Sequence, residues 1–151
     1  MKKIISILML TFSAILLYSC TKSEIGSIIN NNGNNGQAAV LWTFDGTSSS
    51  SDSSNAFLGL KRIMAYKDLS TVQSKKINLN LSSLSVGNYS LSATSPNFLT
   101  YVIATTLDHI SQSGTVNITA NTGAKISGNF SALMENGLTL SGTFSEVPVR
   151  P

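Results

Sequence analysis

Few side chains in this chain of 151 residues could carry catalysis. His109 is the only histidine, Asp108 precedes it, and serines are frequent, so a Ser-His-Asp triad has to be considered. Adjacent residues of a strand point to opposite faces, which places Asp108 badly for orienting the ring of His109. The chain also lacks the Gly-x-Ser-x-Gly motif of a nucleophile elbow. We therefore expect His109 to be an ordinary loop histidine and the chain to have no catalytic residues.

Ligands for metals and phosphates are scattered as well. One histidine and one cysteine do not supply the four nitrogen or sulfur ligands of a structural zinc site. Asp45, Asp52 and Asp68 are too far apart for a contiguous calcium loop, and no glycine-rich phosphate loop follows an expected strand. A glycosidase-type carboxylate pair stays open, because a sequence does not show the distance between two carboxyl groups. We expect no enzyme activity, no cofactor and no metal.

Cys20, the only cysteine, lies in a context that indicates where the protein is located rather than what reaction it performs. The positive start Met1-Lys2-Lys3 leads into an almost unbroken apolar run over residues 4–18. That run is shorter than the roughly twenty residues of a membrane-spanning helix and is typical of a secretory signal peptide. The alternative is a buried N-terminal helix, which the polar tract that follows disfavours.

The last four residues of this segment, Leu17-Tyr18-Ser19-Cys20, resemble the lipobox of bacterial lipoproteins. In that family the cysteine thiol receives a diacylglycerol, and the signal peptide is cut just before it. The resemblance implies a signal peptide over residues 1–19, lipidation of Cys20, and a protein held by that lipid at the outer membrane of the cell envelope. The alternative is a small cysteine buried in a core.

The charge balance argues against a nucleic-acid partner. Loss of Lys2 and Lys3 with the signal peptide would lower the formal net charge from +3 to +1. The remaining basic residues form only two local pairs, Lys61-Arg62 and Lys75-Lys76, whereas nucleic-acid-binding proteins carry basic clusters. We therefore expect the membrane, through Cys20, and a protein or glycan as partners, and no nucleic acid.

The chain after Cys20 divides into a tether and one domain. Residues 20–37 are rich in Asn and Gly, which disfavour helix and strand, and they have no apolar period. We expect a flexible tether there and a single all-β domain over residues 38–151. Its first strand, residues 40–44, is β-branched and aromatic and ends at the turn pair Asp45-Gly46.

The next segments are less uniform. We expect a serine-rich loop over residues 47–55. Residues 56–66 fit a helix or a strand, and the alternation of Ala56, Leu58 and Leu60 favours one strand. Further strands are expected over residues 75–81, 87–93 and 98–104.

Three alternating runs near the C-terminus are separated by turns that contain glycine. Apolar residues and glycines occupy every second position: Val116, Ile118 and Ala120; Ile126, Gly128, Phe130 and Ala132; Leu138, Leu140, Gly142 and Phe144. Asn-Gly between alternating runs is a strong hairpin signal. The pattern predicts an antiparallel β-sandwich with a C-terminal three-strand meander, and a small β-barrel is the alternative.

Two stretches of this meander nearly repeat, Ile-Ser-Gly-Asn-Phe-Ser over residues 126–131 and Leu-Ser-Gly-Thr-Phe-Ser over residues 140–145. In both, an inward glycine lies two residues before a phenylalanine. Glycine weakens a strand, so its use indicates a bend or a close approach by another layer. We interpret the repeat as packing, with Phe130 and Phe144 buried on one face, rather than as a binding motif.

These motifs carry a resemblance. Val86-Gly87-Asn88-Tyr89, the segment 113–118, the Ser-Gly-x-Phe-Ser segment 127–131 and the closing segment 142–148 are similar to those of small, uncharacterised Bacteroidota lipoproteins with a domain of unknown function. The resemblance covers most of residues 38–149 and is strongest after Ser111. It implies an exported, lipid-anchored β domain and no reaction.

Two functions remain open at this level. One is a non-catalytic envelope module that binds a protein or glycan through loops or an exposed sheet. The other is a lipocalin-like barrel that carries a small apolar ligand. Trp42, Tyr66, Tyr89 and Tyr101 could stack on sugars, but such residues at strand ends more often pack in the core. A large cavity would favour the carrier, and a filled core the module.

Overall fold

The structure is a computed structural model that describes residues 40–68, 72–104 and 107–151. All regular structure in these residues is β, as the sequence predicted. Cys20, the expected signal peptide and the expected tether lie outside them. Within the described ranges, no helix is long and apolar enough to cross a membrane. The strands are β1 (Val40–Phe44), β2 (Thr47–Ser50), β3 (Ser53–Phe57), β4 (Arg62–Lys67), β5 (Lys75–Asn80), β6 (Gly87–Leu91), β7 (Phe98–Ile103), β8 (Leu107–Asn121), β9 (Lys125–Met134) and β10 (Thr139–Arg150).

Seven of these strands close a barrel in the order β3, β4, β5, β7, β8, β9, β10 and back to β3. Every neighbouring pair in this ring is antiparallel except β10 and β3, which run parallel and pair Val149 with Ala56 and Arg150 with Phe57. Of the two predicted architectures, the structure is thus the small β-barrel rather than the sandwich. The predicted meander is confirmed as β8, β9 and β10.

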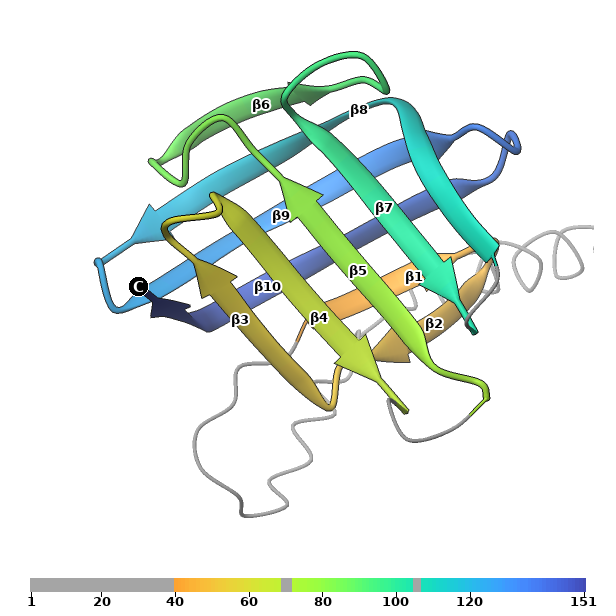
Figure 1. Ribbon diagram of the computed structural model, residues 1–151, viewed down its shortest axis with the longest axis horizontal. Helices are drawn as coiled ribbons and strands as arrows, with labels where there is room; N and C mark the ends of the chain where they lie inside the picture. Colours follow the sequence, from red (N-terminus) through yellow and green to blue (C-terminus); the bar gives the residue numbers. More distant parts are fainter. Residues whose placement is uncertain (1–39, 69–71, 105–106) are drawn as a thin grey trace, which may run out of the picture. The chain divides into compact units, whose positions relative to one another are not determined.

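The barrel closes because β8 and β10 each take part in two layers. The first residues of β8 pair with β7, and the residues after the bulge at Ser111 and Ser113 pair with β9 and β6. β10 pairs with β1 before its bulge near Glu146 and with β3 after it. Bulges bend a strand, so one continuous strand can serve both layers. In Figure 1, β3, β4, β5 and β7 cross in front of β8, β9 and β10.

Three strands extend the rear layer beyond the ring. β1 pairs with β10, β2 pairs with β1, and β6 pairs with β8. Asp45 and Gly46 join β1 to β2 with φ angles of 47° and 74°, as a two-residue type I′ hairpin requires. The predicted turn at Asp45-Gly46 is therefore confirmed, and it places β2 at the edge of the layer.

The barrel interior is filled by one continuous apolar core. Inward side chains come from every strand except β2, which carries only threonine and serine. The largest fully buried side chains are Tyr101, Phe144, Ile63, Ile77, Leu79, Leu99, Ile118, Ile126, Met134, Leu140, Val40 and Val116.

The structure corrects two N-terminal predictions. Residues 47–55, expected as a loop, contribute β2 and the start of β3, because their backbones pair with β1 and β4. Residues 56–66, expected as one strand, form a hairpin whose turn spans residues 58–61, with Lys61 at a φ of 49°. Leu58 and Leu60 therefore lie in the turn and are exposed, although their alternation with Ala56 placed them inward.

The Gly-x-Phe repeat is explained by cross-strand pairs within the meander. Phe130 lies opposite Gly142, and Phe144 lies opposite Gly128. A Cβ atom on Gly128 would lie 2.5 Å from Cζ of Phe144, and one on Gly142 would lie 2.6 Å from Cζ of Phe130. Each ring thus covers the glycine of the neighbouring strand. Both phenylalanines are buried as predicted, and the close approach comes from the adjacent strand rather than from another layer.

Candidate functional site

Asp108 and His109, although adjacent in the chain, have different surroundings in the structure. Asp108 is exposed and pairs in register with Val102, whereas His109 is half-buried and pairs with the inward Tyr101. The ring of His109 stacks on Phe44, with 5.8 Å between ring centroids and an interplanar angle of 27°. Its Nδ1 lies 3.2 Å from Nδ2 of Asn136. His109 is therefore held by a ring and an amide rather than by the neighbouring carboxylate.

The four aromatic residues considered for sugar stacking fall into two groups. Trp42 and Tyr101 belong to the core, with 2% and 1% of their surface exposed. Tyr66 lies half-buried on the outer face of β4, and its hydroxyl is 3.5 Å from Sδ of Met64. Burial raises the pKa of Tyr66, and Arg62 acts in the opposite direction. Tyr89 donates its hydroxyl to the carbonyl oxygen of Ser85 at 2.7 Å. Each of these rings already has a structural role.

A hollow of about 220 Å³ opens at the end of the barrel where β1 and β7 end and β5 begins. The β1–β2 hairpin forms one side of it, and the ends of β5 and β7 form the other. Lys75 spans the two sides, since its Nζ donates to Oγ of Ser49 in β2 at 3.3 Å. The residues that line the hollow are Phe44, Asp45, Thr47, Lys75, Tyr101 and Ile103.

The floor of this hollow is a fixed group of rings. Phe44 packs on Tyr101, with 4.6 Å between the ring centroids, and on His109, the cross-strand partner of Tyr101. The indole Nε1 of Trp42 donates to the hydroxyl oxygen of Tyr101 at 3.4 Å. Burial raises the pKa of Tyr101, while the Trp42 hydrogen bond acts in the opposite direction, so the phenol is neutral near pH 7. The floor is thus mainly aromatic.

The rim supplies polar groups of different kinds. Asp45 offers a carboxylate, Thr47 a hydroxyl and Lys75 an ammonium group above the aromatic floor. Pockets for small molecules usually have volumes of roughly 300–1,000 Å³, so this hollow accommodates a single ring or side chain. In the described ranges, no group of three His, Cys, Asp or Glu side chains could hold a metal ion.

Sequence reasoning did not find this site. Its lining comes from three stretches that are distant in the chain. The pairing of β5 with β7 joins two of them, and the Phe44–Tyr101 ring contact and the Lys75–Ser49 hydrogen bond join these to the β1–β2 hairpin. The turn pair Asp45-Gly46 was the one local signal, because it fixes where Phe44 ends and Thr47 begins.

Comparisons with known proteins assign the domain to a family but indicate no activity. No curated protein and no solved structure matches the chain. A family model with the description "Domain of unknown function (DUF6252)" matches residues 39–148, which is almost the whole described domain. The part of the resemblance that concerns an uncharacterised domain is thereby confirmed, and the chain belongs to the DUF6252 family.

Proposed function

We propose that this protein is a lipoprotein of the bacterial cell envelope, anchored to the outer membrane by a lipid on Cys20, and that its barrel is a non-catalytic module that binds a protein or glycan. The observation that supports the binding role is the hollow at one end of a filled barrel. The lipobox-like segment that ends at Cys20 supports the anchor.

The filled interior favours this module over a carrier of apolar ligands. A carrier needs a closed barrel, which the fold provides, but it also needs internal space. Here Trp42, Tyr101, Phe130 and Phe144 are among the side chains that occupy the interior. The hollow at the end of the barrel is too small for a fatty acyl chain and is open to solvent.

The hollow combines the two features that sugar rings and polar side chains recognise. An apolar ring face, here from Phe44, packs against the C–H face of a sugar or against an aliphatic side chain. Asp45, Thr47 and Lys75 can then accept and donate hydrogen bonds around that ring. A soluble glycan fragment of the envelope is therefore the first probe to use.

The proposed binding site is tested with a ligand titration and with a variant whose new side chain occupies the hollow. The mature chain with Cys20→Ser is titrated with soluble peptidoglycan fragments, and amide shifts are followed by NMR. We expect shifts at Thr47, Lys75 and Ile103. Thr47→Trp should weaken binding about tenfold or more, because the indole occupies the hollow. Thr143→Trp, an exposed threonine on β10, is the matched control and should leave binding unchanged. Shifts confined to other strands, or equal binding by the two variants, would contradict the proposed site.

The anchor is tested separately in cells. We expect the wild-type chain to incorporate labelled palmitate and to partition into detergent, since two acyl chains are enough for stable anchoring. Cys20→Ser should give a soluble or unprocessed form. A processed Cys20→Ser protein that still partitions like wild type would refute the lipid anchor.

A further inference from the structure

The turn between β3 and β4 presents apolar side chains to solvent. Of six large apolar side chains that are exposed in the described residues, Leu58 and Leu60 are the two that lie within three positions of each other, at 56% and 61% exposure. The turn itself is held in place: the amide of Leu58 donates to the carbonyl oxygen of Arg150 at 2.8 Å, and that of Leu81 donates to Lys61 at 3.0 Å. We call residues 58–61 the tip.

Basic side chains surround the tip without acidic partners. Arg62 and Arg150 flank Phe57 in register, and Lys61 belongs to the tip itself. The guanidinium groups of Arg62 and Arg150 bond to amide oxygens, with Nε of Arg62 2.6 Å from Asn80 and Nε of Arg150 3.1 Å from Asn55. Among the described residues, the ion pairs involve Lys67 and Lys125, so no carboxylate pairs with Lys61, Arg62 or Arg150.

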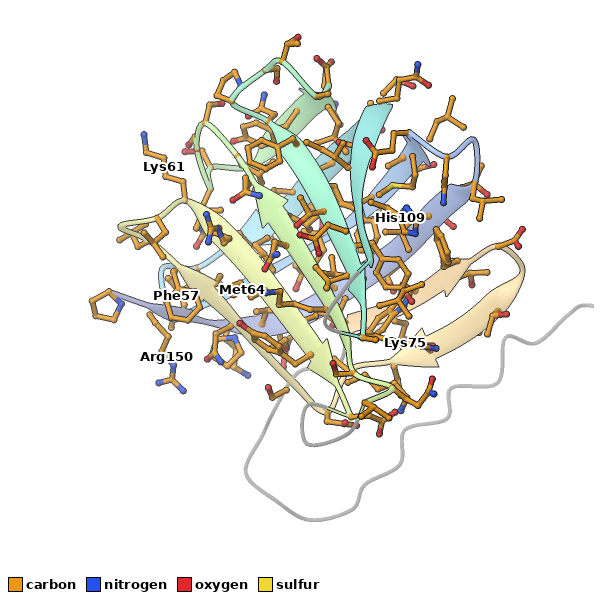
Figure 2. All side chains as sticks on the ribbon, turned by 45° about the vertical axis from the view of Figure 1, so that its right-hand side comes forward. Phe57, Lys61, Met64, Lys75, His109 and Arg150 are labelled. Atoms are coloured by element: carbon orange, nitrogen blue, oxygen red, sulfur yellow. The ribbon has the colours of Figure 1, made fainter. Side chains whose placement is uncertain are left out.

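The two ends of the barrel therefore differ in charge. Strand register places Lys61, Arg62, Lys125 and Arg150 with Glu146 at the tip end, a side-chain charge of 4 − 1 = +3. At the hollow end lie Lys67, Lys75 and Lys76 with Asp45, Asp52, Asp68, Asp108 and Glu135, a charge of 3 − 5 = −2. Figure 2 shows Lys61, Phe57 and Arg150 on one side of the molecule and His109 and Lys75 on the other.

We propose that the tip end docks on the anionic surface of a phospholipid bilayer, the membrane to which Cys20 ties the protein; this inference rests on the proposed lipid anchor. Leu58 and Leu60 would enter the boundary between head groups and acyl chains, where exposed apolar side chains are favourable. Lys61, Arg62 and Arg150 would lie at the level of the lipid phosphates, which attract unpaired basic residues.

The position of Cys20 in the chain makes such a contact effective. Residues 21–39, nineteen residues by 39 − 21 + 1, separate Cys20 from the first strand. A chain of that length spans at most about 65 Å, so the domain stays close to the bilayer at all times. A weak docking surface is then sufficient, because the tether converts docking into an intramolecular step. Docking by the tip directs the hollow, at the opposite end, away from the lipid and towards partners.

The test uses the mature chain with Cys20→Ser, so that no acyl chain contributes. Co-sedimentation is measured with vesicles of phosphatidylcholine alone and of equal parts phosphatidylcholine and phosphatidylglycerol. We expect binding to the anionic vesicles that weakens with salt. Leu58→Ser with Leu60→Ser should lower it about tenfold or more. Arg150→Gln should lower it about fivefold, which corresponds to about 1 kcal/mol for one basic residue at an anionic surface.

Two matched variants control for general effects. Leu133→Ser removes an exposed leucine from the polar outer face of β9, and Lys76→Gln removes one positive charge from the other end. Both should bind vesicles as the parent does. No binding to anionic vesicles, or equal losses in the tip variants and their controls, would overturn the proposal. Vesicle binding that persists when the palmitate experiment fails would remove the anchor and leave the docking surface in place.

Discussion

Phe130 and Phe144 show how single residues fix the packing of this domain. Each ring lies over the glycine opposite it, and each is almost fully buried. A glycine in a strand leaves backbone uncovered and contributes no side chain to the core. The neighbouring phenylalanine supplies the missing contact, so the two Gly-x-Phe motifs depend on each other rather than on a ligand.

Truncation of either phenylalanine should bring the domain close to unfolding. Phe130→Ala and Phe144→Ala each remove a buried ring and leave a cavity, which costs about 3–5 kcal/mol. A domain of this size has roughly 5–15 kcal/mol in total. Asn129→Ala and Thr143→Ala, an exposed cross-strand pair beside the two rings, should cost under about 1 kcal/mol. Denaturant melts of the four variants decide this, and phenylalanine variants that melt with wild type would contradict the packing role.

Two glycine-to-alanine changes should act in opposite directions. At Gly128 the added methyl group collides with the ring of Phe144 and with neighbouring backbone, so we expect a loss of about 1–3 kcal/mol. At Gly59, in the tip, a methyl group meets nothing within 4 Å, and the backbone does not require positive φ. Gly59→Ala should therefore be neutral or stabilise by up to about 1 kcal/mol, because it restricts the unfolded chain. Equal effects of the two changes in thermal melts would show that Gly128 is not covered by Phe144.

Among the elements, β8 bends where it leaves β7, and a side chain at this bend supplies a hydrogen bond to β7. After Ile110 the strand leaves β7 and turns towards β9, so the amide of Leu99 in β7 has no backbone partner there. The hydroxyl oxygen of Ser111 accepts that amide at 2.9 Å, and both residues are buried. One serine thus replaces the ladder hydrogen bond where the barrel turns.

Ser111→Ala should lower the free energy of unfolding. The change leaves the buried amide of Leu99 without an acceptor, which costs about 1–3 kcal/mol. Ser113→Ala, at the other side of the same bulge but exposed, should stay within about 0.5 kcal/mol of wild type. Chemical denaturation gives both values, and hydrogen exchange at the Leu99 amide gives the local one. A neutral Ser111→Ala variant would mean that another group or water takes over the bond.

The elements also show which parts of the fold were predictable from sequence. Alternation located β5, β6 and the meander, because each presents one face to the core and one to water. It failed at bulges: Ala120 continues the alternation of Ile118 in the sequence, but the bulge between them leaves it exposed. Composition misled over residues 47–55, which were expected as a loop: the serine-rich strands there gain their stability from pairing with neighbours.

At the scale of the whole molecule, the two ends of the barrel acquire different properties from residues that are distant in the chain. The hollow joins the first hairpin to β5 and β7, and the tip end joins the β3–β4 turn to the end of β10. Neither arrangement has a local sequence motif, since both follow from barrel closure. The sequence predicted the strands of the meander and most of their inward faces, whereas the sites arise from the order in which the strands pair.

The barrel is closed by a strand pair that is only two residue pairs long. β10 and β3 pair only through Val149 with Ala56 and Arg150 with Phe57, the one parallel pair of the ring. Beside this pair, the carbonyl oxygen of Arg150 accepts the amide of Leu58 at 2.8 Å. The amide of Val149 donates to the carbonyl oxygen of Ala124, also at 2.8 Å, and thereby fixes the end of β10 to β9. Val149 and Arg150 therefore hold the front layer to the rear layer at the tip end.

Removal of residues 149–151 should open the barrel at this seam. The deletion eliminates the two backbone hydrogen bonds, the bond from Arg150 to Asn55 and the packing of half-buried Val149. With about 0.5–1.5 kcal/mol for each hydrogen bond, we expect a loss of roughly 2–4 kcal/mol in the free energy of unfolding. Hydrogen exchange should accelerate at the amide of Leu58 more than at amides shared by β8 and β9, because the meander keeps its own ladder. Deletion of Pro151 alone is the control and should change neither quantity. If the longer deletion melts and exchanges as wild type does, the meander and the front strands are held together by the core alone, and the parallel pair does not contribute to closure.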